Sequence, residues 1–427
     1  MSSPYNTFSY FTFGCKVNFA DTCTISRQLI DKGLSEVKID DIADIYIINT
    51  CSVTENANKK ARRFINRLHK KSPDSKIIVT GCYAQLNPEE LNNIPGVSCV
   101  VSAENKFNVE SYIDFNNLGN SSIDINDVNK FNISYSINER TRAFLKIQDG
   151  CDYTCSYCTI PMARGKSRSS SVNKTVLKVK EIIKQGINEI VLCGINVGDY
   201  GMNNNENLME LLIQLESIVG LKRYRISSIE PNLLNEELIH FISQSSKALP
   251  HLHIPLQSGS DVILKSMQRR YNTRFYKNLI NLINNCIPNI CIGVDVIVGY
   301  PNESDNLFED TYNFLKDLDI SYLHVFSYSD REDTLSSIMD SKVCNEDKSS
   351  RRKILQQLSE QKYRNFVNRN IKEVKEVLFE NYNDGLVDGL SDNYIRVYAE
   401  GKSDLINSIK QVKIIENSLN TYGEIIN

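Results

Sequence analysis

Short apolar runs alternate with amphipathic stretches along the first quarter of the chain. The apolar runs predict strands at Ser9–Gly14, Ile45–Thr50, Lys76–Gly81 and Ser98–Ala103. Between them, apolar residues recur at helical spacing at about 18–33 and 54–71. Strands that alternate with helices are typical of a parallel sheet with helices on its faces. We therefore expect an open parallel-sheet α/β domain over residues 5–115.

A polar segment then leads to a second region with the same alternation. Residues 116–138 are rich in Asn, Ser and Asp, and they predict a linker. Beyond it, six apolar runs predict strands at Arg142–Gln148, Glu189–Gly194, Arg223–Ile229, His251–Leu256, Cys291–Tyr300 and Tyr322–Ser329. Each gap holds a helical pattern, so residues 139–370 fit a partial (β/α)6 barrel, with an open doubly wound sheet as the alternative. In a barrel, the chemistry lies at the carboxyl ends of the strands.

The pattern changes again near residue 371. Short β-like runs broken by Gly, Asn and Asp predict a small antiparallel β module over residues 371–427. From Glu376 to Asn427 there are nine acidic and four basic residues, a net charge of −5. This charge makes the module an unusual RNA-binding surface, because phosphate contacts dominate RNA affinity.

The composition changes this picture mainly through cysteine. The 427 residues suffice for two or three domains, and no apolar run is long enough to predict a membrane-spanning helix. The first residues lack the pattern of a signal peptide, so we expect a cytoplasmic protein. In such a reducing compartment, twelve cysteines favour metal or redox chemistry over disulfides.

Three of these cysteines follow the first predicted barrel strand. Cys151, Cys155 and Cys158 have the spacing CxxxCxxC. Three thiolates on one loop can hold three irons of a [4Fe–4S] cluster, which leaves the fourth iron open to the amino and carboxylate groups of S-adenosylmethionine (SAM). The alternative is zinc, but a structural zinc site needs a fourth ligand and the loop offers none nearby. Tyr157 either packs against the adenine of SAM or faces the core.

Three further cysteines each follow a predicted strand of the first domain. Cys15, Cys51 and Cys82 stand at strand ends that share one edge of a parallel sheet, where ligands bind. One such cysteine would be an ordinary small buried residue, but three at equivalent positions indicate a common site. We infer a second [4Fe–4S] cluster with three protein ligands and one open iron.

A basic run lies on the second predicted helix. Residues 59–71 (KKARRFINRLHKK) contain seven Lys or Arg and no acid. Such a run is either a solvated helix face or a surface for a polyanion, because each neutralised phosphate releases counterions. The motif MQRRY at 267–271 leaves the same choice open. The candidate phosphate contacts are Lys59, Arg62, Arg63, Arg67, Arg269 and Arg270.

Several motifs together resemble those of the radical SAM methylthiotransferases over nearly the whole chain. They are GCKVNFADT at 14–22, NTCSVTENANKKAR at 49–62, TGCYAQ at 80–85, GCDYTCSYCTIPMARGKSRS at 150–169, LCGINVGDYG at 192–201, RISSIEP at 225–231, HLHIPLQSGS at 251–260 and DVIVGYPNE at 295–303. The resemblance implies a methylthiotransferase N-terminal domain with an auxiliary cluster, a radical SAM barrel and a C-terminal TRAM-like module. One motif departs from the family pattern, since FSYSDREDT at 326–334 has Glu332 and Asp333 in place of Pro and Gly.

The resemblance also implies a reaction and partners. Lys16, Val17 and Asn18 resemble the branch that methylthiolates C2 of N6-threonylcarbamoyladenosine next to the anticodon of tRNA. Other branches act on isopentenyladenosine in tRNA or on a ribosomal-protein aspartate. The enzyme would need tRNA, an electron donor protein and a sulfur source, and no membrane. Outside this class, the alternative is a non-catalytic Fe–S protein that binds RNA or senses redox state.

Polar residues at the predicted strand ends are candidates for binding SAM. Such side chains suit the ribose and methionyl ends of the cofactor, although some of them would serve equally well as helix caps or loop contacts. The residues are Asn196, Ser228, Glu230 and Gln257, beside Tyr157.

Overall fold

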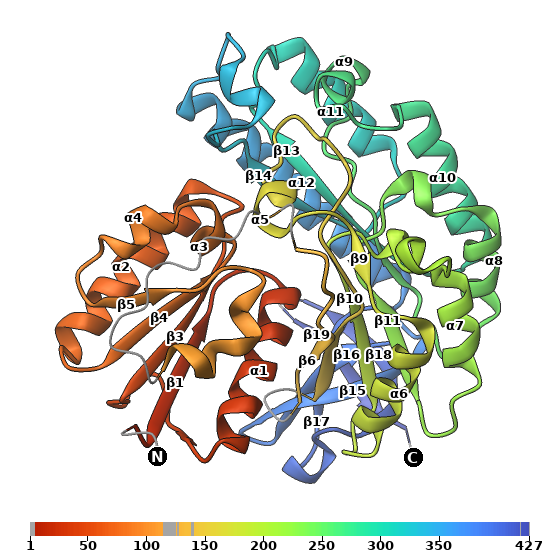
Figure 1. The fold of residues 1–427 in the computed structure, drawn as a ribbon. Helices are drawn as coiled ribbons and strands as arrows, with labels where there is room; N and C mark the ends of the chain where they lie inside the picture. The colour runs from red at the N-terminus through yellow and green to blue at the C-terminus, as the bar shows by residue number, and fades with distance from the viewer. Residues whose placement is uncertain (1–4, 114–124, 126–127, 138–140, 419, 427) are drawn as a thin grey trace.

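The computed structural model describes residues 5–113, 125, 128–137, 141–418 and 420–426 (Figure 1). Much of the expected linker, residues 116–124, 126–127 and 138, lies outside the described residues. The remainder of it contains strand β6 (Ser134–Tyr135), which pairs antiparallel with β7 (Arg142–Lys146). That part of the expected linker is therefore an edge strand of the next sheet.

The N-terminal domain is a parallel sheet in the order β2-β1-β3-β4-β5. Its strands are β1 (Thr7–Thr12), β2 (Ser35–Glu36), β3 (Ile45–Thr50), β4 (Lys76–Gly81) and β5 (Val97–Val100). The helices around it are α1 (Lys16–Asp31), α2 (Glu55–Lys71), α3 (Cys82–Leu86), α4 (Pro88–Asn92) and the 3-10 helix η1 (Asn105–Tyr112). The predicted α/β fold is confirmed, with β1 two residues earlier than expected.

The local sequence explains the central elements of this domain. Strand β3 is buried at every position, since it lies between two parallel neighbours and carries apolar side chains on both faces. Helix α2 begins at Thr54, whose hydroxyl accepts a hydrogen bond from the amide of Ala57. Its apolar residues Phe64, Ile65 and Leu68 recur at helical spacing and are buried, so its basic residues face outward.

The second region is a partial barrel of six parallel strands. These are β7, β10 (Glu189–Cys193), β11 (Arg223–Ile226), β12 (His251–His253), β13 (Cys291–Val298) and β14 (Tyr322–Ser327). They pair in chain order, and single bridges such as Ser228 with His253 join β11 to β12. Within the described residues β7 and β14 do not pair, so the barrel is open on that side. A doubly wound sheet would reverse its strand order, and this alternative is therefore excluded.

Helices cover the outside of the barrel (Figure 1). They are α6 (Val172–Ile183), α7 (Leu208–Glu216), α8 (Glu236–Gln244), α9 (Asp261–Ser266), α10 (Thr273–Cys286), α11 (Asp305–Asp317) and α12 (Asn345–Arg369). The short β8 (Gln148–Asp149), β9 (Arg168–Ser169) and α5 (Ile160–Arg164) form the loop after β7. All six barrel strands end one to three residues earlier than predicted.

The N-terminal domain packs against the open side of the barrel through α1. Val17 and Ala20 contact the inward-facing Phe144, Val191 and Cys193 of β7 and β10. This apolar contact places the carboxyl edge of the first sheet beside the carboxyl ends of the barrel strands.

The C-terminal module is a closed barrel in the order β15-β16-β17-β19-β18. Its strands are β15 (Val374–Asn383), β16 (Leu386–Ser391), β17 (Arg396–Glu400), β18 (Ile409–Asn417) and β19 (Thr421–Ile425). Most pairs are antiparallel as predicted, but β17 and β19 run parallel, which closes the barrel.

A buried charged layer joins this module to the radical barrel. Glu189 on β10 forms an ion pair with Arg223 at 2.8 Å and accepts a hydrogen bond from Arg225 at 3.1 Å. Both arginines also donate to main-chain carbonyls of the C-terminal module, and Arg142 donates to Glu380 at 2.7 Å. Part of the module's acidic character therefore serves docking. No helix among the described residues is long and apolar enough to cross a membrane.

Candidate active site between two cysteine triads

The CxxxCxxC loop lies at the carboxyl end of the first barrel strand. The amide of Cys151 donates to the carbonyl of Gly165 at 3.0 Å, which ties the start of the loop to the end of α5. Arg269 donates to the Cys155 sulfur at 3.2 Å and also pairs with Glu230. Burial raises the pKa of the Cys151 and Cys158 thiols to about 12. These thiols lose their protons only when a metal centre compensates the charge, as the formation of an iron–sulfur cluster does.

The N-terminal cysteines occupy three adjacent positions at the edge of their sheet. Cys15 caps α1, Cys51 follows β3 and Cys82 begins α3. Gly14 has φ of +102°, and a Cβ on it would lie 2.9 Å from the Cys51 sulfur. Gly81 has φ of +97°, and a Cβ on it would likewise lie too close to the main chain of Thr50. Glycine before two of the cysteines therefore lets the strand ends approach closely.

Each triad offers three thiols, the number that a [4Fe–4S] cluster with one open iron requires, whereas a structural zinc site takes four ligands. Burial, with smaller contributions from Cys82 and Cys15, raises the pKa of the Cys51 thiol to about 12, so a metal centre would be needed to stabilise its thiolate.

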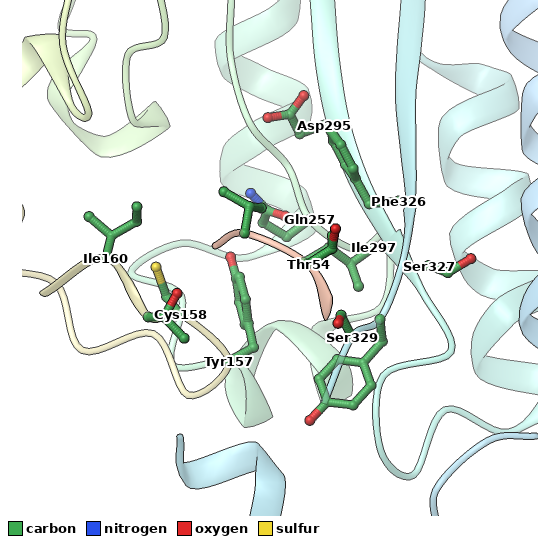
Figure 2. Close-up of a pocket in the computed structure, with 13 residues that line it drawn as sticks. Thr54, Tyr157, Cys158, Ile160, Gln257, Asp295, Ile297, Phe326, Ser327 and Ser329 are labelled. Carbon is green, nitrogen blue, oxygen red and sulfur yellow. The ribbon is translucent and has the colours of Figure 1, made fainter. Parts of the chain in front are cut away.

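A cavity of about 180 Å³ is lined by Cys158 of the radical loop and by residues that follow Cys51 in the sequence (Figure 2). Val53 and Thr54, which follow Cys51, line one side of the cavity. Tyr157 and Cys158 line another side. The barrel strands contribute the remaining wall, through Gln257, Asp295, Ile297, Phe326 and Ser327. A ligand in this cavity would thus contact residues next to both cysteine triads.

A buried arginine lies between the two triads. Arg164 donates to Asp149 at 2.7 Å on the radical-loop side and to Asn18 on the N-terminal side. Its charge and its hydrogen bond lower the pKa of the Cys82 thiol, although burial has the larger effect and leaves that pKa raised. Arg164 Nε is buried without a hydrogen-bond partner in the described part of the chain. An anionic cluster at the N-terminal triad would supply that partner.

A second arginine reaches the same triad from the motif FSYSDREDT. Arg331 donates to Ser52 at 2.6 Å and to Glu55 at 3.2 Å, and its Nε is also buried without a partner among the described residues. The amide of Glu55 donates to Ser329 at 3.1 Å. Asp333 takes φ of +63°, a conformation that Asp tolerates, so the replacement of the family's Gly leaves this loop intact.

The other predicted SAM-binding residues occupy different environments. Gln257 and Tyr157 line the cavity. Asn196 is buried, donates to Asp199 at 2.8 Å and accepts from the amide of Glu230. Ser228 lies at the bridge between β11 and β12. Glu230 is engaged by Arg269 beside Cys155.

The predicted phosphate contacts divide into two groups. Lys59, Arg63 and Arg67 are exposed on α2 and remain candidates. Arg62 is engaged by Glu55 and Glu90, both at 2.8 Å. Arg269 has only 3% of its side chain exposed and forms an ion pair with Glu230, so little of its guanidinium is accessible to a phosphate. Arg270 is exposed and stacks on the ring of Tyr153 at 3.8 Å.

Sequence reasoning missed the polar residues that connect the triads. Arg164 and Arg331 both stand inside recognised motifs, but nothing in their spacing shows that they cross to the other domain. Asp149 directly precedes the cysteine loop and forms ion pairs with Lys146 and Arg164. A buried acid next to a cysteine loop is unusual in itself. Asp149 could therefore have been predicted to form an ion pair with a basic residue of the loop such as Arg164.

Comparison with known proteins agrees with this architecture. Residues 7–102 match the family described as "Uncharacterized protein family UPF0004", and residues 145–315 match the Radical SAM superfamily. The radical SAM methyltransferase TsrM from Kitasatospora setae, solved with cobalamin and a [4Fe-4S] cluster, aligns with a TM-score of 0.56 at 12% identity, over 78% of this chain and 77% of that chain. The fold and the cysteine loop define a radical SAM enzyme, a class that uses SAM and a [4Fe–4S] cluster.

Proteins of similar sequence show to which family of radical SAM enzymes the chain belongs. The threonylcarbamoyladenosine tRNA methylthiotransferase MtaB of Bacillus subtilis (strain 168) is 37% identical, over 96% of this chain and 94% of that protein. A tRNA-2-methylthio-N(6)-dimethylallyladenosine synthase of Endomicrobium trichonymphae is 31% identical, over 97% of this chain and 99% of that protein. The chain belongs to the radical SAM methylthiotransferase family.

Proposed function

We propose that this protein methylthiolates C2 of N6-threonylcarbamoyladenosine next to the anticodon of tRNA. The observation that carries the proposal is one cavity lined both by Cys158 and by Val53 and Thr54, which follow Cys51 in the sequence. Methylthiolation must bring a radical source and a sulfur carrier to the same carbon. A cavity lined by residues adjacent to Cys51 on one side and Cys158 on the other meets that requirement.

Cys151, Cys155 and Cys158 are proposed to hold the radical cluster, with SAM on its open iron. The bound and reduced cluster supplies a radical, which an aromatic C–H needs because no side-chain base removes that hydrogen at neutral pH. In this arrangement Arg269 orients the loop through Cys155, and Tyr157 and Gln257 border the cofactor.

Cys15, Cys51 and Cys82 are proposed to hold a second [4Fe–4S] cluster, whose open iron would carry the sulfur. The donor set fits, since the three thiols share one edge of the sheet and two buried arginines direct unpaired Nε–H groups into their surroundings. Arg164 and Arg331 both come from the radical barrel. The site is therefore complete only when the two domains are docked.

The substrate branch rests on sequence similarity and on charge. Relatives named for threonylcarbamoyladenosine reach 37% identity, against 31% for the dimethylallyladenosine synthase, and Lys16, Val17 and Asn18 resemble the motif of the former branch. Bases of an anticodon loop can be splayed out into a protein cavity. Lys59, Arg63 and Arg67 are proposed to contact the tRNA backbone. The reaction also requires an electron donor protein and a sulfur source.

Nucleoside mass spectrometry tests this function. Anaerobically reconstituted protein is incubated with SAM, a reductant, sulfide and threonylcarbamoylated tRNA, and the digested tRNA is examined for the 2-methylthio nucleoside. We expect product from the intact protein and none from Cys151→Ala or Cys82→Ala. Parallel reactions contain isopentenylated tRNA and ribosomal protein. Product only in one of these parallel reactions would reassign the substrate, and absence of 5′-deoxyadenosine in all reactions would contradict the enzyme itself.

A further inference from the structure

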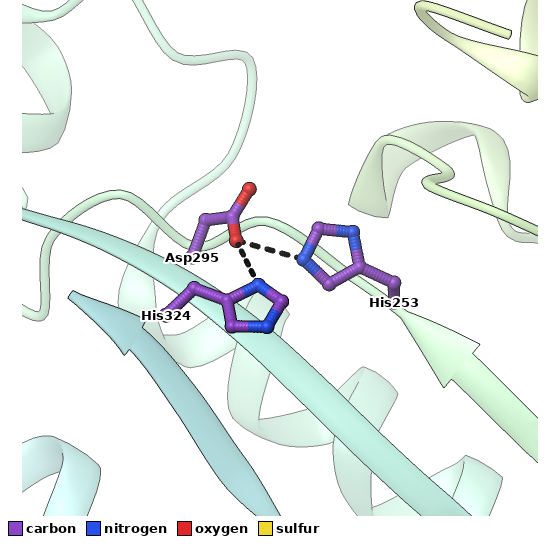
Figure 3. A group of neighbouring side chains, drawn as sticks. All are labelled: His253, Asp295 and His324. Carbon is purple, nitrogen blue, oxygen red and sulfur yellow. Dashed lines mark hydrogen bonds and ion pairs between the residues drawn. The ribbon is translucent and has the colours of Figure 1, made fainter. Parts of the chain in front are cut away.

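The barrel interior carries a second group of metal-ligating side chains apart from the cysteines. His253 lies on β12, Asp295 on β13 and His324 on β14 (Figure 3). These strands are adjacent and parallel, with Asp295 opposite His324 and with His253 opposite Gly293, two residues before Asp295. All three side chains therefore stand on the inward face at neighbouring levels.

The ligand atoms converge on one point. His253 Nε2 lies 2.8 Å and His324 Nδ1 lies 3.1 Å from the same oxygen, Asp295 Oδ1. All three atoms lie within 4.8 Å of one another, the only group of three such ligands among the described residues. Ligands bonded to one ion at about 2.1 Å lie about 3.0 Å apart in an octahedron and about 3.4 Å apart in a tetrahedron. The two nitrogen–oxygen separations of 2.8 and 3.1 Å are close to the octahedral spacing, and the third separation is below 4.8 Å.

The second carboxylate oxygen of Asp295, Oδ2, takes no part in the contacts with the two histidines. Two imidazoles that only needed hydrogen bonds could each take a separate oxygen of Asp295. In the described part of the chain, both instead meet at Oδ1, and no hydrogen bond reaches Oδ2. Figure 3 shows the two dashed lines ending on one oxygen. The two nitrogens and this oxygen are close enough together for one ion to be bonded to all three.

The surroundings leave coordination positions open on one side only. Toward the amino ends of the strands, the ring of Tyr322 covers Gly293 and bonds to His251 at 3.0 Å, so this side is closed. Toward the carboxyl ends, Asp295 lines the cavity that Cys158 also lines, and 52% of the His324 side chain is exposed. Water or another oxygen ligand can reach an ion from the cavity side.

We propose that His253, Asp295 and His324 bind a divalent first-row transition-metal ion. Two imidazoles and one carboxylate are a ligand set that suits Mn²⁺, Fe²⁺ and Zn²⁺ and leaves positions open on the ion. The site contains no sulfur, so its preference differs from that of the cysteine triads, and Mn²⁺ selects it because that ion favours nitrogen and oxygen ligands over thiolates. The inference stands independently of the proposed tRNA substrate.

Electron paramagnetic resonance tests the site. Mn²⁺ is titrated anaerobically into protein whose clusters are loaded and oxidised, a state in which [4Fe–4S] centres are silent, and the decrease of the free Mn²⁺ signal is followed. We expect one bound Mn²⁺ per chain, displaced by stoichiometric Zn²⁺. Asp295→Asn and His324→Gln should each weaken binding by about tenfold or more. His240→Gln, which changes an exposed histidine on α8, is the matched control and should bind as the parent does.

Two results would overturn the proposal. The parent protein could bind no Mn²⁺ at millimolar concentration, or the two variants could bind it as tightly as the parent and the control. Cluster absorbance and circular dichroism establish that each variant is folded. His324→Gln alters a half-exposed side chain, so it keeps the test decisive should Asp295→Asn disturb the barrel.

Discussion

Arg164 donates a hydrogen bond to Asp149 at 2.7 Å, and this buried pair lies between the two cysteine triads. Asp149 precedes Cys151 by two residues, and Arg164 follows Cys158 by six, so the pair closes the base of the radical loop. The same guanidinium reaches Asn18 and Cys82 in the other domain. One side chain thus fixes the radical loop relative to the N-terminal triad.

Replacing Arg164 should change the electronic properties of the N-terminal cluster. Removal of a positive charge next to a cluster makes reduction harder, so Arg164→Gln should lower its reduction potential. Arg164→Lys keeps the charge but cannot donate to Asp149 and Asn18 together, and it should have a smaller effect. The potential is measured by redox titration in a background where Cys151, Cys155 and Cys158 are alanine. The exposed Arg63→Gln serves as the control, and equal potentials in all variants would contradict the role of Arg164.

The buried carboxylate of Glu189 should contribute strongly to stability. Burial alone would raise its pKa, but Arg225, Arg223 and Arg142 together lower that pKa to about 2. A lowered pKa means that the stabilisation is complete above the ordinary value near 4.5 and is lost only as the pH falls through about 2. At pH 7.5, Glu189→Gln leaves buried arginines without their counter-charge and should cost about 3–5 kcal/mol.

Urea unfolding at pH 7.5 measures this cost. The exposed Glu236→Gln on α8 is a matched control and should lie within about 0.5 kcal/mol of the parent. The destabilisation should be accompanied by faster proteolysis of the C-terminal module, because Arg223 and Arg225 hold that module through its carbonyls. An unfolding midpoint equal to that of the control would show that the charged layer does not stabilise the interface.

The sequence allowed the fold and all six cysteine positions to be predicted, because both follow from local patterns. Apolar runs mark strands, and a residue after a parallel strand must lie at the shared edge. The bridging contacts of Arg164 and Arg331 could not be predicted, since they join residues 146 and 279 positions apart. They depend on how two domains dock. The His253, Asp295 and His324 group likewise requires the register of three strands, which alternation alone does not determine.

The pH dependence of stability should include a contribution from Asp199. Burial raises the pKa of this carboxyl to about 6, against an ordinary 3.8, despite the hydrogen bond from Asn196. A raised acid pKa stabilises the fold fully below about 3.8, and this stabilisation is lost as the pH rises through about 6. Between pH 5 and pH 8 the unfolding free energy of the parent should therefore fall by about 1.4 kcal/mol relative to Asp199→Asn.

Parallel urea titrations of parent and Asp199→Asn at pH 5, 6.5 and 8 check this difference. Asn keeps the acceptor for Asn196, so the packing is preserved and only the titration is removed. The two curves should diverge mainly between pH 5 and pH 7. Parallel curves across the whole range would show that Asp199 titrates near its ordinary value in the folded protein.

The exposed basic face of α2 should set tRNA affinity and its salt dependence. Lys59, Arg63 and Arg67 are exposed and project from a helix whose apolar side is buried in the N-terminal domain. Changing all three to Glu should weaken binding of threonylcarbamoylated tRNA and reduce the slope of log affinity against log salt by about one for each phosphate that is no longer neutralised.

Arg274→Glu with Lys277→Glu, on the outer helix α10, is the control for a general change in charge. Arg62→Gln should lower stability by removing its pairs with Glu55 and Glu90 and leave the salt slope unchanged. If the α2 triple variant keeps both the affinity and the slope of the parent, α2 is a solvated helix face and tRNA binds elsewhere.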